Sequence, residues 1–146
     1  MPTSPSPSYK TYVSPEWWYS LGYPASWYSF PVQPSSESAT TKAFSNQDTE
    51  SYEGLGSDGV LVALTVDPED LVCSVSGPKN DPRVTSTPIV LDGVQTTEWF
   101  YLNGIGVTVA HANWCYRFSL LTISPETRDK FRAEADHMLS TFRFNR

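Results

Sequence analysis

Several absences narrow the class of protein that this chain can be. Its 146 residues hold no run of about 18 apolar residues, so no transmembrane helix is expected. Basic side chains are scarce: 10 Lys and Arg stand against 16 Asp and Glu, which gives a net charge of −6. Binding of nucleic acid needs a clustered basic surface, so this charge balance argues against a nucleic-acid partner.

The sequence also lacks the motifs that place catalytic groups. It contains no G-x-G-x-x-G, Walker, H-E-x-x-H or nucleophile-elbow pattern. Its two histidines, His111 and His137, fall on a predicted strand and on the predicted C-terminal helix, where structural roles are expected. A nucleophile with its base and orienting acid is not indicated, and neither is Cys115 acting with His111. The sequence therefore predicts no catalytic residue and no enzyme.

Cysteine is nearly absent, with Cys73 and Cys115 as the two examples. No C-x-x-C pair occurs, which argues against a structural zinc site. Two buried free thiols and a single disulfide both remain compatible with the sequence. A disulfide would suit an exported protein, since such bonds persist in oxidising compartments.

Acidic side chains crowd two short stretches. The first holds Asp67, Glu69 and Asp70, and the second holds Asp48, Glu50, Glu53 and Asp58. Solvated loops are the expected setting of both stretches. The alternative is a weak divalent-cation site, because hard cations bind several carboxylate oxygens, but the spacing of a calcium loop is missing. No metal site and no cofactor are predicted.

Residues 1–8 are mostly proline and serine, which is typical of a flexible leader. They hold no basic and apolar segments of a signal peptide. They fit either the remainder of an exported or lipid-anchored precursor or a disordered N-terminus. Residues 9–146 are predicted to form one α+β domain, because a chain of this length buries enough surface for one core.

What the chain has in abundance is aromatic side chains, at 14% of its residues. Seven of them fall between residues 17 and 30, namely Trp17, Trp18, Tyr19, Tyr23, Trp27, Tyr28 and Phe30. Pro15 and Pro24 exclude one long helix there, so we expect strands over 18–23 and 27–31 with a turn between them. A sheet that begins near Trp18 follows from this pattern.

Further strands are expected wherever alternating or β-branched residues occur. They are predicted over 41–46, 60–66, 89–91, 94–102, 105–111 and 115–123, with 60–66 as a central strand buried on both faces. Asp92-Gly93 and Asn103-Gly104 predict hairpin turns, and a kink is expected at 112–114. Loops are expected over 33–41 and 47–59, and a helical turn over 68–71.

The C-terminal segment predicts a helix followed by a short strand. Ser124 can cap free amide groups, Pro125 suits the first helical position, and Glu126 suits the positive end of the helix dipole. An apolar stripe then runs through Phe131, Ala135, Met138, Leu139 and Phe142. Phe142 and Phe144 alternate as in a strand. The predicted strands and helix together indicate an α+β domain with an antiparallel sheet.

Three segments resemble PsbP-like domains. The run from Trp18 to Trp27 (WYSLGYPASW) is similar to their aromatic-x-hydrophobic-x-Tyr-Pro-x-x-Trp opening. Phe131 to Phe144 resembles their closing helix and its hydrophobic-x-Ser/Thr-Phe-x-Phe strand, and Ile89 to Gly93 resembles a mid-sheet element. The resemblance implies a central, mostly antiparallel sheet flanked by helices, an α/β/α sandwich, over about residues 9–144. Extrinsic photosystem subunits, bacterial lipoproteins, a Ran-GTPase-binding import factor and secretion chaperones share that fold, and they dock on other proteins.

Three functions are ranked on these grounds. The first is a non-catalytic accessory protein, monomeric and extracytoplasmic in an envelope or thylakoid lumen, that docks on a protein partner. The second is a module that binds a small ligand or glycan through exposed aromatics near Trp17, and the third is a weak hydrolase. Because neighbours on a strand face opposite ways, Trp17 and Trp18 are not both expected to point inward. Candidate binding residues are Trp17, Trp18, Tyr19 and Tyr28.

Overall fold

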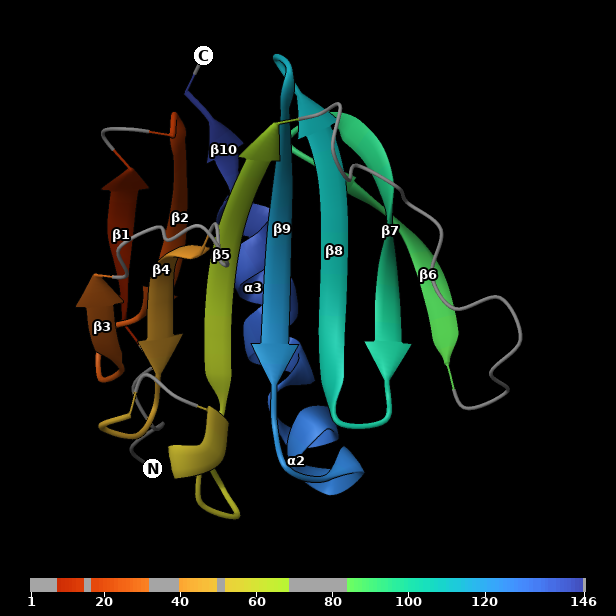
Figure 1. Ribbon diagram of the computed structural model, residues 1–146. Coiled ribbons are helices and arrows are strands. Elements are labelled where there is room, and N and C mark those ends of the chain that lie inside the picture. The colour runs from red at the N-terminus through yellow and green to blue at the C-terminus, as the bar shows by residue number, and fades with distance from the viewer. Residues whose placement is uncertain (1–7, 15–16, 32–39, 50–51, 69–83, 146) are drawn as a thin grey trace, which may run out of the picture.

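The computed structural model of the chain describes residues 8–14, 17–31, 40–49, 52–68 and 84–145 (Figure 1). The strands are β1 (Tyr9–Ser14), β2 (Tyr19–Pro24), β3 (Tyr28–Pro31), β4 (Thr40–Ser45), β5 (Leu61–Pro68), β6 (Thr85–Leu91), β7 (Val94–Tyr101), β8 (Gly104–His111), β9 (Trp114–Leu121) and β10 (Arg143–Phe144). The helices are the 3-10 turn η1 (Tyr52–Gly54), α2 (Pro125–Lys130) and α3 (Arg132–Thr141).

The described strands form two sheets. The larger has the order β3-β4-β5-β9-β8-β7-β6, and the smaller has the order β1-β2-β10. Every described pairing is antiparallel, so the predicted sheet type is confirmed. Helix α3 lies behind the large sheet and contacts β2, while α2 lies at the lower end of that sheet and contacts β8 (Figure 1).

The main core fills the space between the large sheet, α3 and the small sheet. On β9, Tyr116, Phe118 and Leu120 point into it, as their predicted alternation requires. Phe142 lies at its centre, where its ring stacks on Tyr19 from β2 at 5.7 Å between centroids. Aromatic packing thus joins the small sheet to the large one.

The predicted start of the C-terminal helix is confirmed in detail. The Ser124 hydroxyl accepts a hydrogen bond from the Thr127 N–H at 3.2 Å, and Pro125 takes the first turn. The predicted single helix is divided in two at Phe131, whose φ of −98° and ψ of 7° interrupt the helical path. The interruption lets the Phe131 ring turn into the core, where it meets Trp27 edge-on.

In the large sheet, one predicted hairpin turn is confirmed and one predicted kink is wrong. Asp92 and Gly93 form the predicted turn, with φ values of 46° and 83°. The kink predicted at 112–114 is instead a tight hairpin turn, with Ala112 and Asn113 at φ values of 52° and 71°. The strand predicted over 60–66 is an interior one, β5, but Ala63 and Thr65 on its second face are only half-buried.

The first strand of the fold was missed. The sheet was expected to begin near Trp18, whereas β1 precedes that residue and pairs along its whole length with β2. Lys10 and Thr11 in β1 are exposed, and this polarity hides the strand pattern. Tyr12 nevertheless packs against the core, where its ring meets Tyr19 and Phe44. The predicted strands over 18–23 and 27–31 do form, but they join different sheets.

Some predictions concern segments beyond the described residues. These are the leader over residues 1–8, apart from Ser8, most of the loop over 33–41, and the helical turn over 68–71, apart from Pro68. The assignment of one domain to residues 9–146 stays a prediction. No helix in the described ranges is long and apolar enough to cross a membrane.

Candidate functional site

The described surface carries its densest group of exposed apolar side chains at the β7–β8 turn. Tyr101, Leu102 and Ile123 are 37%, 47% and 41% exposed, and they account for half of the large exposed apolar residues identified in the described chain. The Thr122 N–H donates to the Asn103 carbonyl at 2.8 Å, which brings Ile123 to the turn that holds Leu102. We call Tyr101, Leu102, Leu121 and Ile123 the Tyr101 patch.

A pocket of about 230 Å³ borders the Tyr101 patch, and Tyr101 and Leu121 are the patch residues that line it. Its lining includes Tyr101, Gly104, Gly106, Ser119 and Leu121. Strand register places these five on one face of the sheet, because Gly104 pairs with both Tyr101 and Leu121 and Gly106 pairs with Ser119. The two glycines leave the pocket-bearing face of β8 without side chains at these positions. A Cβ on Gly106 would lie 3.2 Å from the Tyr101 ring. The pocket therefore has a backbone floor and an aromatic wall.

Glycine is required at position 104 because two strands approach closely there, and not because the backbone adopts a left-handed conformation. The predicted Asn103-Gly104 hairpin does form, but its turn residues are Leu102 and Asn103, and Gly104 already belongs to β8. A Cβ on Gly104 would lie 2.5 Å from the Leu120 carbonyl oxygen of β9. Only glycine lets the two strands approach so closely here.

Helix α2 fixes the turn that carries the Tyr101 patch. Arg128 donates to the carbonyl oxygen of Tyr101, lies 3.5 Å from that of Leu102, and is paired with Asp129 at 2.9 Å. Carbonyl contacts from a guanidinium orient the backbone without covering the Tyr101 ring. The patch is thus an exposed apolar surface on an anchored turn.

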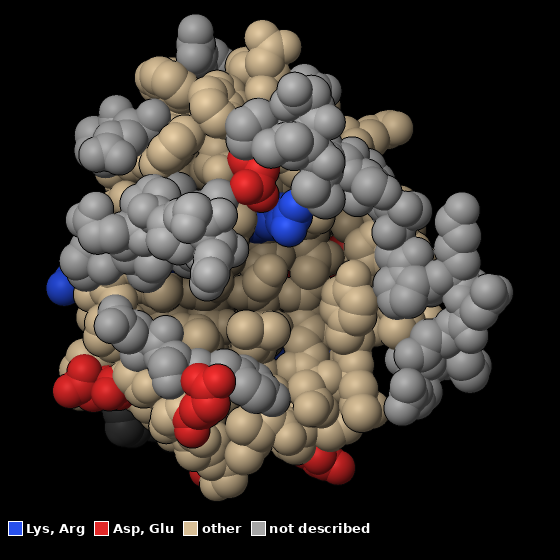
Figure 2. Space-filling view, in the orientation of Figure 1, with Lys and Arg blue, Asp and Glu red and all other residues tan. Residues whose placement is uncertain are grey.

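The face of the sheet that bears the pocket has few charges among its described residues. Figure 2 views this face, and its described surface over the middle of the large sheet is mainly uncharged. An ion pair between Asp67 and Arg117, at 3.5 Å, lies toward the opposite end of β5 and β9. Both partners are partly exposed, so the pair is worth at most about 1 kcal/mol. Apolar contact, not charge, is the dominant chemistry of the Tyr101 patch.

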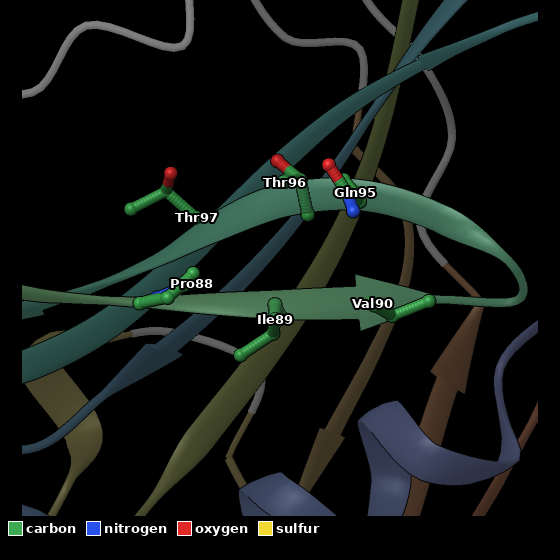
Figure 3. A pocket seen from close by; sticks show the side chains of 6 residues that line it. All are labelled: Pro88, Ile89, Val90, Gln95, Thr96 and Thr97. Carbon is green, nitrogen blue, oxygen red and sulfur yellow. The ribbon is translucent and has the colours of Figure 1, made fainter.

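A second recess, of about 550 Å³, follows the β6–β7 hairpin (Figure 3). Its walls come from Pro88, Ile89 and Val90 on β6 and from three polar residues of β7, Gln95, Thr96 and Thr97. Leu91 and Val94 flank the two-residue turn and form a hydrogen-bonded pair. Hydrogen-bonded and non-hydrogen-bonded positions alternate along β6, so the Pro88 nitrogen points away from β7, toward the free edge of the sheet. Proline there removes a donor from the edge strand, which discourages pairing with another chain.

The structure separates the four binding residues that the sequence suggested. Trp17 and Trp18 lie in the turn before β2, so the strand alternation assumed for them does not apply. Trp17 is half-buried against Trp114 at 5.3 Å, and Trp18 has a left-handed φ of 55°. Tyr19 is fully buried in the core, which corrects its expected place on an exposed aromatic surface.

Tyr28 lies at the same end of the sheet as the Tyr101 patch. It is exposed and stacks on Phe30, and the register continues from it through Ser45 and Leu61 to Leu121. Trp17 meets Trp114 at the opposite end of β9, seven residues from Leu121 and therefore roughly 23 Å away. Tyr28 and Trp17 do not form one surface.

The remaining residues considered from the sequence fall into structural settings. His111 stacks on Phe144 and His137 on Tyr9, each at 3.9 Å between ring centroids. Cys115 is disulfide-bonded, which decides between the two alternatives that the sequence left open for this residue; Cys73, the other cysteine of the sequence, lies outside the described residues.

The acidic stretches form no metal site in the described part of the chain. Among the described residues, no three His, Cys, Asp or Glu side chains converge. Glu50, Glu69 and Asp70 lie outside the described residues. Asp58 instead approaches Lys130 at 3.7 Å.

The pocket itself was missed from the sequence. A signal was present: Trp99 and Tyr101 alternate on β7 directly before Gly104-Ile105-Gly106, so large rings face a strand that lacks side chains. That signal needs the β7–β8 register to be interpreted, because a shift of one residue would turn the rings to the other face.

Comparison with known proteins gives a structural likeness only. No family model matches the chain, and no curated protein sequence matches it. The solution structure of cyanobacterial PsbP (CyanoP) from Synechocystis sp. PCC 6803 is similar, with a TM-score of 0.59 and 14% sequence identity. The likeness covers 95% of this chain and 94% of that protein. The chain therefore has the PsbP-like fold, as its terminal motifs implied.

Proposed function

We propose that this chain is a non-catalytic accessory protein that binds a protein partner through the Tyr101 patch, outside the cytoplasm. The observation that carries the proposal is the gathering of exposed Tyr101, Leu102 and Ile123 at an anchored turn, beside a pocket that Tyr101 lines. Exposed apolar patches on folded proteins commonly mark interaction sites. The PsbP-like fold supports an accessory role, because the families that the sequence resemblance implies dock on other proteins.

The dimensions of the pocket favour one side chain of a partner over a complete small ligand. Its volume of about 230 Å³ is below the range of about 300–1,000 Å³ that is usual for ligand sites. Protein interfaces depend on a few aromatic or apolar anchors that fill such hollows. The Tyr101 ring can both stack on an inserted side chain and keep its hydroxyl in water.

The proposed location outside the cytoplasm is supported by the cysteine chemistry. Cys115 is disulfide-bonded, and such bonds persist in periplasmic, lumenal and extracellular compartments. An envelope or thylakoid-lumen setting is compatible with this bond, and with a lipid anchor on a longer precursor.

Photo-cross-linking tests the proposed docking surface. A photoreactive amino acid at Leu102 is expected to capture one defined protein in membrane or envelope fractions of the source organism. The same group at exposed Val13, on the small sheet, serves as the control and is expected to capture nothing specific. Tyr101→Ala should weaken binding of the captured protein about 10- to 100-fold, as loss of an interface anchor does. Equal capture from both positions, or unchanged binding by Tyr101→Ala, would contradict the proposal.

A second candidate function is the binding of a small ligand or glycan at Trp17 and Trp18. The observation in its favour is the left-handed backbone of Trp18, since strained non-glycine residues concentrate at functional sites. Titration with cell-wall sugars, followed by tryptophan fluorescence, is expected to give a saturable change that Trp18→Phe reduces. Trp99→Phe, on the large sheet, is the matched control. A flat titration would remove this candidate.

A further inference from the structure

A carboxyl pair between β7 and α3 stands apart from the proposed docking surface. Glu98 is 3% exposed, although it carries an ionisable group, and its Oε2 atom is buried without a hydrogen-bond partner in the described structure. Its neighbour across the interface is Asp136 of α3, with which its side chain shares a hydrogen bond. Two carboxyl groups can form such a bond only when one of them holds a proton.

The surroundings of Glu98 favour its protonated form. Burial has the largest effect, followed by the hydrogen bond to Asp136 and the negative charge of Asp136, and together they raise the pKa of Glu98 from 4.5 to about 7. Arg132, one turn earlier on α3, opposes this rise. On the adjacent strands Glu98 is flanked by Thr87 and Val107, which carry no charge.

Arg132 does not neutralise the pair completely because its guanidinium lies over another group. Its central carbon is 4.4 Å from the centroid of the Phe100 ring, two residues after Glu98 on the same face of β7. A guanidinium over an aromatic face makes a cation–π interaction with the ring, so its charge is not directed at the carboxyl groups alone. Two carboxyl groups and one shared cation thus meet where α3 covers β7.

We propose that Glu98 and Asp136 act as a proton-sharing clasp between β7 and α3, closed when the pair holds one proton and loosened when it holds none. Two negative charges on these hydrogen-bonded carboxyl groups would repel each other, the more strongly because Glu98 is buried, whereas one shared proton converts that repulsion into a bond. The clasp makes the attachment of α3 sensitive to pH near neutrality.

A proton fits this place better than a metal ion. Hard cations take six to eight oxygen ligands, whereas this place offers two carboxyl groups beside the positive Arg132. No third acidic, histidine or cysteine side chain joins them within the described residues.

The direction of the pH effect follows from the raised pKa of Glu98. The folded protein binds this proton more tightly than the unfolded chain does, so the stabilisation is present at acidic pH. It is lost progressively as the pH rises from about 4.5 to about 7, and above that range this group contributes no further change.

Carboxyl NMR together with amide exchange tests the clasp in the complete chain. The Glu98 carboxyl carbon is expected to titrate near pH 7, and Asp136→Asn should move that midpoint toward more acidic pH. Exchange of α3 amides, corrected for intrinsic rates, should become about tenfold faster per pH unit on approaching the midpoint. Glu98→Gln should abolish this pH dependence, while Glu126→Gln, an exposed carboxyl change on α2, should preserve it.

Two outcomes would overturn the clasp. One is a Glu98 midpoint near 4.5, its ordinary pKa. The other is a shift of the Glu98 signal on addition of Mg²⁺ or Ca²⁺ that Glu98→Gln abolishes, since it would identify a cation site instead. If Glu98→Gln fails to fold, the titration midpoint of Glu98 in the Asp136→Asn variant is the deciding measurement, and an unchanged midpoint would overturn the clasp. Asp136 is exposed, so its substitution spares the core.

Discussion

Phe142→Ala is expected to lower the free energy of unfolding by about 3–5 kcal/mol, which is a large part of the stability of a domain this size. Phe142 is 2% exposed and contacts rings from both sheets: it stacks on Tyr19 of the small sheet and meets Tyr116 of the large sheet edge-on. Truncation removes these contacts and leaves a cavity where the two sheets join. Urea unfolding followed by circular dichroism measures the loss, and the thermal midpoint should fall by roughly 10 °C.

Val13→Ala provides the control for Phe142→Ala. Val13 is an exposed apolar residue of the small sheet, and its truncation should change the free energy of unfolding by less than about 0.5 kcal/mol. A loss below about 1 kcal/mol for Phe142→Ala would show that Phe142 does not join the sheets as described.

Gly104→Ala should destabilise the protein by about 1–3 kcal/mol, although it adds a single methyl group. The new Cβ would lie 2.5 Å from the Leu120 carbonyl oxygen, and a backbone atom of β9 that is held by strand pairing on both sides cannot rotate away. β8 must therefore separate from β9, which also strains the bonds from Thr122 to the Asn103 carbonyl. Chemical unfolding measures the destabilisation.

Gly106→Ala is the matched control, because it lies two residues along the same strand and on the same face. Its Cβ would approach the Tyr101 ring at 3.2 Å, and a side chain can move by a few tenths of an ångström. Alanine also restricts the unfolded chain more than glycine does, so near-neutral stability is expected. Equal losses for the two variants would mean that the backbone contact at Gly104 is not decisive.

Local features of the fold were predictable because their signals act over a few residues. Ser124 and Pro125 begin a helix whatever surrounds them, and Asp92-Gly93 adopts the left-handed conformations that a tight hairpin needs. The alternation of Tyr116, Phe118 and Leu120 likewise assigns the faces of β9. The Ala112–Asn113 turn escaped prediction because alanine rarely adopts a positive φ.

The candidate site was predictable only in part. Tyr28 was identified as an exposed aromatic and lies at the same end of the sheet as the Tyr101 patch. Trp17 was proposed because strand alternation would expose either Trp17 or Trp18, yet Trp17 lies in a turn and is partly buried against the core. Glu98 was overlooked, although its alternation with core-facing Phe100 on β7 marks it as a carboxyl that points inward.

The sequence by itself determined an antiparallel α+β chain, the Asp92-Gly93 turn, the start of the C-terminal helix and the terminal motifs that imply a PsbP-like fold. The tertiary structure decided the distant pairings, such as β2 with β10 and β5 with β9, and with them the burial of Tyr19, the pocket over Gly104 and the burial of Glu98. The physical reason is the distance along the chain over which each interaction acts. Turns and caps are fixed by neighbouring dihedral angles and hydrogen bonds, whereas burial depends on which remote surfaces pack together, and that choice is made by the whole core at once.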